Sequence, residues 1–269
     1  MALLYEKSGH IAKLGLKREK EKNALDPEIL LDIHRAWEDI NEDNEIRVAI
    51  LYSALPNIFC SGMDLRTAIP VLTRAREPET EAEKWLITDS KGVGEAMLRY
   101  SFVKKPVIVA IHGYCLTGGF EMAMGADLRV ASKDAVFQMR EASLGIMPVG
   151  GANVFLPRLI SPSRALEILL TADNYDAETL YEWGFLNRLV SRREDLMDAS
   201  MELATKIASN GPLAVQGMIR LAREIRTKDM EYALNRELEI GTPIFSSEDA
   251  REGVRAQREK RRPDFKGKL

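Results

Sequence analysis

Residues 106–131 read PVIVAIHGYCLTGGFEMAMGADLRVA, and this stretch decides the fold that we expect. Its apolar run at 107–111 is typical of a strand buried on both faces, as in a parallel sheet covered by helices. Glycines follow this run, an apolar helix is expected to begin near Gly119, and residues 128–131 read as a short strand. This order of strand, helix and strand predicts an α/β fold with a parallel sheet.

The flanking sequence extends the same pattern. Further strands are expected at 3–7, 11–16, 48–52 and 136–138. Asp26 and Pro27 form a helix start, with Asp as the N-cap and Pro at the first helical position. The charged residues 67–100 predict an exposed helix that is broken by Pro70 and Pro78. Helical spacing dominates later, at 163–170, 177–183, 195–209 and 212–226, and Ser246–Asp249 resembles a capping box before a last helix.

The composition argues against several classes of function. The chain has 269 residues, and 38 Lys and Arg against 41 Asp and Glu give a net charge of −3, whereas a nucleic-acid-binding protein needs a basic excess. Its three histidines and two cysteines show no zinc-site spacing and allow at most one disulfide. No apolar run reaches the about 20 residues of a membrane span, and no secretory signal is visible. We therefore expect a cytoplasmic protein without a metal, a membrane or a nucleic acid as partner.

The glycine-rich segment 112–127 could hold an anion. Free N–H groups at the start of its helix carry partial positive charge, which suits an oxyanion that develops during a reaction. Glu121 lies in the first turn of this helix. From these residues alone, Glu121 either takes part in chemistry or only complements the helix dipole.

Two further segments carry candidate groups. Residues 59–64, FCSGMD, form a glycine turn, and one of its backbone N–H groups could face the N–H of Gly118. Residues 140–151, REASLGIMPVGG, place Glu141 between a short strand and a loop shaped by glycine and proline. Functional side chains gather on such loops, but without further context the favoured interpretation of Glu141 is a surface glutamate.

Taken together, these segments resemble the enoyl-CoA hydratase/isomerase family, which has the crotonase fold. The resemblance begins with NAL at 23–25, includes the segments 59–64, 105–132 and 140–151, and continues through 170–190 and 247–268. It implies an α/β, crotonase-like spiral of ββα units with a C-terminal helical region. Residues 1–195 would form the core for acyl-CoA binding and catalysis, and residues 196–269 would serve assembly into a homotrimer or a dimer of trimers.

The resemblance also implies an activity. Family members bind acyl-CoA thioesters, and the backbone N–H groups at Met63 and Gly118 would form the oxyanion hole. Hydratases of the family use two glutamates, at the positions of Glu121 and Glu141, to add water across the 2,3 double bond or to remove it. Coenzyme A enters as part of the substrate, so no separate cofactor is expected. Which glutamate is the acid stays open.

Contacts to the substrate and its CoA moiety are expected from a wider set of residues. By resemblance, these are Ser61, Asp64, Leu65, Arg66, Arg18, Lys22, Ala24, Val149, Phe265 and Lys266. For Arg18 and Lys22, the alternative is a solvated run of charges. For Phe265, the alternative is an aromatic side chain that anchors the tail.

Three positions depart from the hydratase pattern. Val149 stands where glycine is usual and where the N–H helps to hold water, so its branched side chain could shrink the water site. Thr117 stands where a glycine triplet usually begins, and Arg140 stands where proline is common. A carnitinyl-CoA dehydratase-like or isomerase-like enzyme therefore stays an alternative. RNA binding and a non-catalytic acyl-CoA scaffold are further alternatives, which the mixed charges of 13–22 and the two glutamates respectively disfavour.

Overall fold

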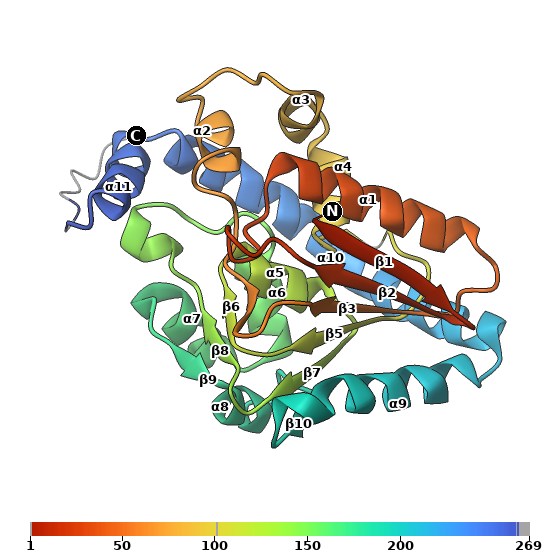
Figure 1. Ribbon diagram of the computed structural model, residues 1–269. Coiled ribbons are helices and arrows are strands. Elements are labelled where there is room, and N and C mark those ends of the chain that lie inside the picture. Colours follow the sequence, from red (N-terminus) through yellow and green to blue (C-terminus); the bar gives the residue numbers. More distant parts are fainter. Residues whose placement is uncertain (1, 101, 262, 264–269) are drawn as a thin grey trace.

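A six-stranded sheet forms the centre of the molecule (Figure 1), whose computed structural model describes residues 2–100, 102–261 and 263. Its strands follow the order β1-β2-β3-β5-β7-β10. They are β1 (Leu3–Ser8), β2 (Ile11–Leu16), β3 (Val48–Ser53), β5 (Val107–Ile111), β7 (Leu128–Ser132) and β10 (Arg188–Val190). Only the β1–β2 pair is antiparallel among the paired strands of this sheet; the others are parallel. The predicted parallel sheet is confirmed.

A second, smaller sheet is formed by strands that lie between those of the large sheet along the chain. It has the order β4-β6-β8-β9 and consists of β4 (Ile58–Cys60), β6 (Tyr114–Leu116), β8 (Val136–Gln138) and β9 (Tyr175–Asp176). Strands β3 and β4, β5 and β6, and β7 and β8 are consecutive pairs, and each pair gives one strand to each sheet. Helical segments follow every pair, so the chain repeats a ββα unit.

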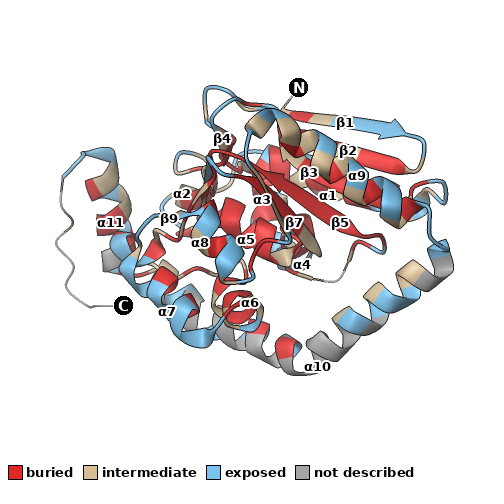
Figure 2. Ribbon diagram, turned by 90° about the horizontal axis from the view of Figure 1, so that it is seen from below, coloured by how far each residue is buried: buried red, intermediate tan, exposed pale blue. Residues whose placement is uncertain are grey.

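Helices cover both faces of the large sheet. Helix α1 (Pro27–Glu42) lies on one face and α9 (Leu196–Ala208) on the other (Figure 1). The alternation along β3 explains the two cores, because Ala49 and Leu51 point to the larger one and Val48 and Ile50 to the one under α9. Figure 2 shows β3 and β5 buried along almost their whole length, whereas β1 at the edge is largely exposed.

Helix α1 starts where the sequence predicts. The side chain of Asp26 accepts a hydrogen bond from the N–H of Ile29, and Pro27 opens the helix. The last helix differs slightly from the prediction, because its N-cap is Ser247, whose hydroxyl accepts from the N–H of Ala250. The expected capping box at Ser246–Asp249 is therefore wrong: the N-cap lies one residue later, and Ala250 at the third helical position has no side chain that could complete a box.

The segment 67–100 differs more from its prediction. It forms α2 (Ala68–Leu72), α3 (Glu81–Thr88) and α4 (Ser90–Ala96). Pro70 lies inside α2 and does not break it, because a proline in the first turn removes an N–H that has no helical partner. The segment is also not simply exposed, since Leu86 is only 3% exposed and Val71 only 2%. In this segment, a few apolar side chains that are separated by charged residues point into the core.

The other helical segments follow the strands along the chain. They are α5 (Gly118–Gly125), η1 (Glu141–Leu144), α6 (Ala152–Leu159), α7 (Pro162–Thr171), α8 (Ala177–Glu182), η2 (Arg193–Asp195), α10 (Pro212–Phe245) and α11 (Glu248–Arg258). Helix α10 runs well past the predicted end at 226, because residues 227–240 contain neither glycine nor proline. Within the described ranges, no helix combines the length and the apolar character needed to cross a membrane.

Candidate active site

Two glycine turns lie side by side because the strands before them are paired. β4 and β6 are parallel partners, and Cys60 lies opposite Cys115. The chain continues from β4 to Met63 and from β6 to Gly118, and a Cβ atom on Gly118 would lie 3.5 Å from the backbone nitrogen of Met63. Neither of these N–H groups donates a hydrogen bond to another described residue. The structure thus brings together two free donors, as predicted for an oxyanion hole.

Gly62 and Thr117 lock these turns together. Gly62 has φ +96°, and a Cβ atom on it would lie 1.6 Å from the Oγ1 atom of Thr117, so only glycine fits. Thr117 itself has φ 46° and ψ −119°, a conformation that costs a β-branched residue energy. Its hydroxyl donates to the carbonyl of Ser61 at 3.5 Å, across the two turns. Thr117 therefore has a backbone conformation that is more typical of glycine.

Glu121 is held by the start of another helix. It lies in the first turn of α5 and is 5% exposed. Its Oε1 atom accepts a hydrogen bond of 3.1 Å from the N–H of Ala152, the first residue of α6. The Oε2 atom packs against Gly150, where an added Cβ atom would lie 2.4 Å away. A helix N-terminus that donates to a carboxylate stabilises its anionic form.

Glu141 has a contrasting environment. It opens η1 after β8, is 7% exposed, and its Oε2 atom has no hydrogen-bond partner in the described part of the chain. Burial raises the pKa of Glu141 to about 7, while the neighbouring charge of Arg140 opposes this shift. A carboxyl group with such a pKa carries a proton in a large fraction of molecules at neutral pH. The two glutamates therefore differ in their hydrogen bonds: Oε1 of Glu121 accepts from a backbone N–H, whereas Oε2 of Glu141 has no partner among the described residues.

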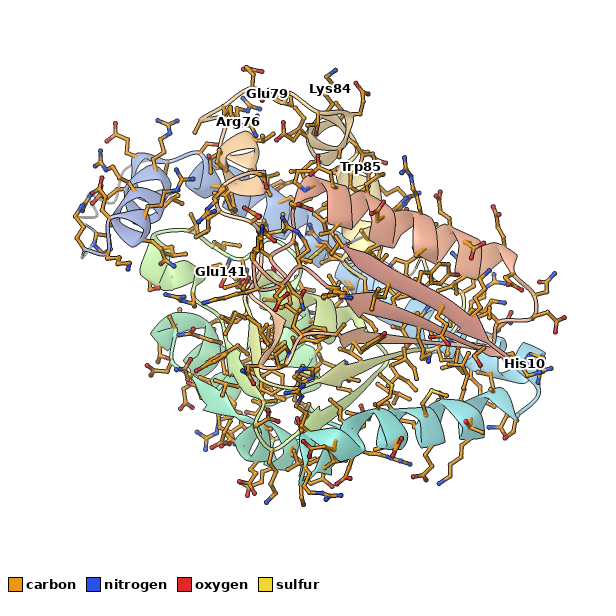
Figure 3. All side chains as sticks on the ribbon, in the orientation of Figure 1. His10, Arg76, Glu79, Lys84, Trp85 and Glu141 are labelled. Atoms are coloured by element: carbon orange, nitrogen blue, oxygen red, sulfur yellow. The ribbon has the colours of Figure 1, made fainter. Side chains whose placement is uncertain are left out.

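Both glutamates and both N–H groups line one cavity of about 230 Å³. We call Met63, Gly118, Glu121 and Glu141 the polar wall. Figure 3 shows Glu141 inside the molecule, between the sheets and the helices, whereas His10 lies at the far end of the β1–β2 hairpin.

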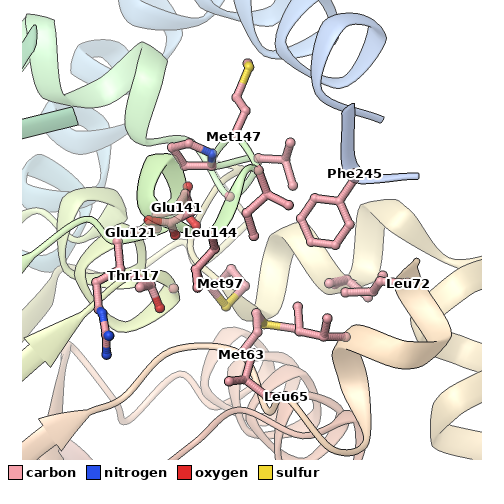
Figure 4. A pocket seen from close by; sticks show the side chains of 18 of the residues that line it. Met63, Leu65, Leu72, Met97, Thr117, Glu121, Glu141, Leu144, Met147 and Phe245 are labelled. Carbon is pink, nitrogen blue, oxygen red and sulfur yellow. The ribbon is translucent and has the colours of Figure 1, made fainter. Parts of the chain in front are cut away.

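The side of the cavity across from the glutamates is apolar. We call five of the apolar residues that line the cavity the apolar wall: Leu72 of α2, Leu86 of α3, Val93 of α4, Met97 at the C-cap of α4 and Phe245 of α10. Figure 4 shows Leu72 and Phe245 across the cavity from the two carboxylates, with Met97 between them. A cleft with convergent polar groups on one side and aliphatic side chains on the other suits a small ligand that has a polar head and an apolar tail.

Helix α11 supports the loop that carries Glu141. A Cβ atom on Gly253 would lie 1.8 Å from the carbonyl oxygen of Leu144, so the two backbones are in direct contact. Gln257, one turn further along α11, lines the cavity. The position of η1, and with it the carboxyl group of Glu141, therefore depends on the C-terminal helix.

The residues predicted to contact CoA are only partly gathered here. Ser61, Leu65 and Val149 line the cavity, whereas Lys22 and Arg66 are exposed outside it. Phe265 and Lys266 lie outside the described residues.

Arg18 is held within the protein. Its guanidinium lies 2.7 Å from the carboxylate of Asp26 and 3.3 Å from that of Asp64, and it also donates to the carbonyl of Ala24. Asp64 in turn accepts from the N–H groups of Arg66 and Thr67. These bonds give Arg18, Ala24 and Asp64 a structural function in shaping the turn at 59–64. Arg18 is therefore not part of a solvated run of charges, which was the alternative for this residue.

Several residues of the site were missed in the sequence. Gly150 and Ala152 fix the carboxylate of Glu121, and Gly253 positions η1. The paired glycines at 150–151 and a glycine inside the helical pattern of 248–258 were the available signals. Phe245 lies in a helix without an active-site motif, and nothing in the sequence pointed to it.

Comparisons with known proteins bear on the fold and on the class of the protein. A sequence model of the family described as enoyl-CoA hydratase/isomerase matches residues 6–268. Enoyl-CoA hydratase EchA19 of Mycobacterium tuberculosis is 35% identical over 267 residues, covering 98% of this chain and 96% of that protein. Carnitinyl-CoA dehydratase of Proteus mirabilis is 37% identical over 265 residues, covering 97% and 96%. The crystal structure of carnitinyl-CoA hydratase from Mycobacterium avium is 28% identical, with a TM-score of 0.86 over 98% of both chains. The expected fold is thereby confirmed.

Proposed function

The chain belongs to the enoyl-CoA hydratase/isomerase family, and from this premise we propose that it is a 2-enoyl-CoA hydratase. Its relatives support a hydratase or dehydratase activity on CoA thioesters. The finer proposal is that water adds across the 2,3 double bond of the thioester, and that the same site catalyses the reverse dehydration. The observation that carries it is the pair of buried glutamates with opposite environments in one cavity.

The two free N–H groups of the polar wall would act on the thioester oxygen. When water attacks Cβ, negative charge moves through Cα to this oxygen and forms an enolate. The backbone nitrogen of Met63 lies close to Gly118, and both residues line the cavity, which suits donation of their N–H groups to that oxygen. Since donors preorganised in a water-poor site stabilise charge without reorientation, this pair would lower the barrier.

Glu121 would accept the proton of the attacking water. Its carboxylate is fixed by the N–H of Ala152, and the positive end of α6 stabilises its negative charge. An anionic and positioned carboxylate is what a general base requires.

Glu141 would deliver the proton to Cα. Its buried carboxyl group has a pKa raised to about 7 and is therefore partly protonated near neutral pH. Water then loses one proton to Glu121 and Cα gains one from Glu141. Before the next turnover, Glu121 releases its proton to solvent and Glu141 takes one up from solvent. Val149 lines the cavity beside this centre, where its side chain would limit the space for water.

The test is a panel of 2-enoyl-CoA thioesters of increasing chain length, followed by loss of the conjugated absorbance. We expect hydration of at least one member by the wild type, and a kcat lower by a factor of about 10²–10⁴ in Glu121→Gln and in Glu141→Gln. Circular dichroism of both variants checks that the fold is intact. Near-normal kcat in either variant contradicts the assignment.

A further inference from the structure

The loop between η1 and α6 connects the two proposed proton-transfer groups. It follows η1, which begins with Glu141, and it leads to Ala152, whose N–H binds the carboxylate of Glu121. Residues 146–150 of this loop all line the cavity. Under the function proposed above, the α- and β-carbons of the enoyl group react between the two carboxyl groups. The loop is therefore the part of the cavity lining that runs beside these two carbons.

Val149 lies in this loop directly before a contact with Glu121. The contact is made by Gly150, where an added Cβ atom would lie 2.4 Å from Oε2 of Glu121. Glu121 is the group that would activate the water for its attack on the β-carbon of the substrate. Since Val149 lines the cavity one residue before this contact, its side chain is placed beside the β-carbon.

The loop leaves Val149 little freedom to move aside. On one side, the carbonyl of Pro148 accepts a hydrogen bond of 2.8 Å from the side chain of Asn153 on α6. On the other side, Gly150 is packed against the carboxylate of Glu121. A valine side chain is itself restricted at χ1, because two methyl groups branch from its Cβ atom. Neither the backbone nor the side chain can therefore easily make room for an additional group on the substrate.

A methyl group on the β-carbon of the substrate would require such room. Hydration adds the hydroxyl to the β-carbon and a proton to the α-carbon. In a linear enoyl group, the β-carbon keeps one hydrogen atom throughout this step. In a 3-methyl-branched group, a methyl group replaces that hydrogen, and the product is a tertiary alcohol without a small substituent on the β-carbon. One methyl group in a closely packed site changes kcat/KM by about 10–200-fold.

We propose that Val149 restricts the enzyme to 2-enoyl-CoA thioesters that are unbranched at the β-carbon. The inference rests on the proposed function, because it concerns the carbon that water attacks. Val149 acts here through the space that its side chain fills, and it transfers no proton. It is a specificity-determining residue within the same cavity as the two glutamates.

The test compares 2-butenoyl-CoA with 3-methyl-2-butenoyl-CoA, which differ by one methyl group. For the wild type, we expect kcat/KM to be about 100-fold higher for the linear substrate. The two substrates also differ in intrinsic reactivity, and this difference cancels when the ratio is compared between variants. Val149→Ala removes both methyl groups of the side chain and should narrow the ratio about tenfold. A ratio that Val149→Ala leaves unchanged overturns the proposal.

Two further variants serve as controls for this change. Val149→Thr keeps a side chain that branches at Cβ, so it should leave the ratio unchanged. Leu86→Ala enlarges the cavity at the apolar wall, on α3, and should also leave the ratio unchanged. Equal narrowing in Leu86→Ala and in Val149→Ala would mean that the total space of the cavity, and not Val149, sets the preference, which overturns the proposal.

Binding of saturated analogues separates this proposal from the hydratase assignment. 3-Methylbutanoyl-CoA has the shape of the linear product, and 3,3-dimethylbutanoyl-CoA has the shape of the branched product. Calorimetry should show tighter binding of the former to the wild type and a smaller difference in Val149→Ala. This result without hydration of either enoyl substrate supports the role of Val149 and contradicts the hydratase assignment. Hydration with a ratio that Val149→Ala leaves unchanged supports the hydratase assignment and overturns the role of Val149.

Discussion

The two walls of the cavity are built in different ways. The polar wall uses backbone N–H groups and two carboxyl groups that lie within a few residues of strand ends, at β4, β6 and β8. The apolar wall uses side chains from α2, α3, α4 and α10, which are up to 173 residues apart along the chain, from Leu72 to Phe245. Backbone geometry therefore positions the groups that we propose for the chemistry, and side-chain packing shapes the apolar side of the cavity that we propose for the acyl group. A change in the polar wall should affect kcat, and one in the apolar wall should affect the choice of substrate.

Breaking the polar wall at Gly62 should have the largest effect. In Gly62→Ala, the new methyl group would overlap the side chain of Thr117 and strain a backbone with φ +96°. The turns would separate and the two N–H groups would no longer converge, so kcat/KM for hydration should fall by a factor of about 10²–10³.

Gly217→Ala is the control for this change. Gly217 lies on α10 with no atom within 4 Å of an added Cβ atom, and alanine favours a helix. This variant should hydrate at the wild-type rate. A Gly62→Ala enzyme with normal activity and a normal fold would mean that the turns do not hold the oxyanion.

Displacing Glu121 without removing it should have the next largest effect. In Gly150→Ala, the methyl group would lie 2.4 Å from Oε2 of Glu121, so the carboxylate must move away from the N–H of Ala152. We expect kcat to fall by a factor of about 10–100 with a smaller change in KM, since misplacement by about 1 Å is costly. A change in KM alone would indicate that Gly150 shapes only substrate binding.

The pH profile tests the proton on the glutamate pair. Burial raises the pKa of Glu141 to about 7, so its protonated fraction falls as the pH rises through this value. Hydration and dehydration both need one proton on the pair, and kcat/KM of both should therefore fall about tenfold per pH unit above pH 7. The residual activity of Glu141→Gln should lack this fall. A wild-type profile that stays flat from about pH 6 to 9 contradicts the assignment of Glu141.

A substitution in the apolar wall should have the smallest effect on kcat and should change the preference for acyl chain length. Leu86 is 3% exposed and faces the cavity from α3. Leu86→Ala enlarges the cavity and should raise kcat/KM for longer acyl chains relative to shorter ones by a factor of about 3–10. It should also lower the free energy of unfolding by about 2–5 kcal/mol. Chemical denaturation and the thioester panel measure both effects, and an unchanged preference would place Leu86 outside the acyl site.

The same contrast explains what the sequence could predict. Met63, Gly118, Glu121 and Glu141 follow recognisable strands and glycine turns, so local patterns and the family resemblance located them together. Leu72 and Phe245 became neighbours only through the packing of α2 and α10, which no local pattern encodes. The exposure predicted for 67–100 failed for the same reason, because a high proportion of charges conceals a few buried side chains such as Leu86.

The environments of the glutamates also lay beyond the sequence. The hydrogen bond from Ala152 to Glu121 joins residues 31 positions apart, and the burial of Glu141 depends on η1 and on its contact with Gly253 of α11. Sequence analysis therefore left open which glutamate is the acid. The proposed division between an assembly region at 196–269 and a core stays a prediction, although α11 also reaches the active site.

The most direct test of the central claim follows the Cα protons of a saturated acyl-CoA in deuterated water by NMR. By microscopic reversibility, the group that delivers a proton to Cα also removes one from it, and no water needs to attack. The account predicts that Glu121→Gln keeps the exchange of these protons and that Glu141→Gln loses it. Exchange that persists in Glu141→Gln and disappears in Glu121→Gln would contradict the assignment of the two glutamates.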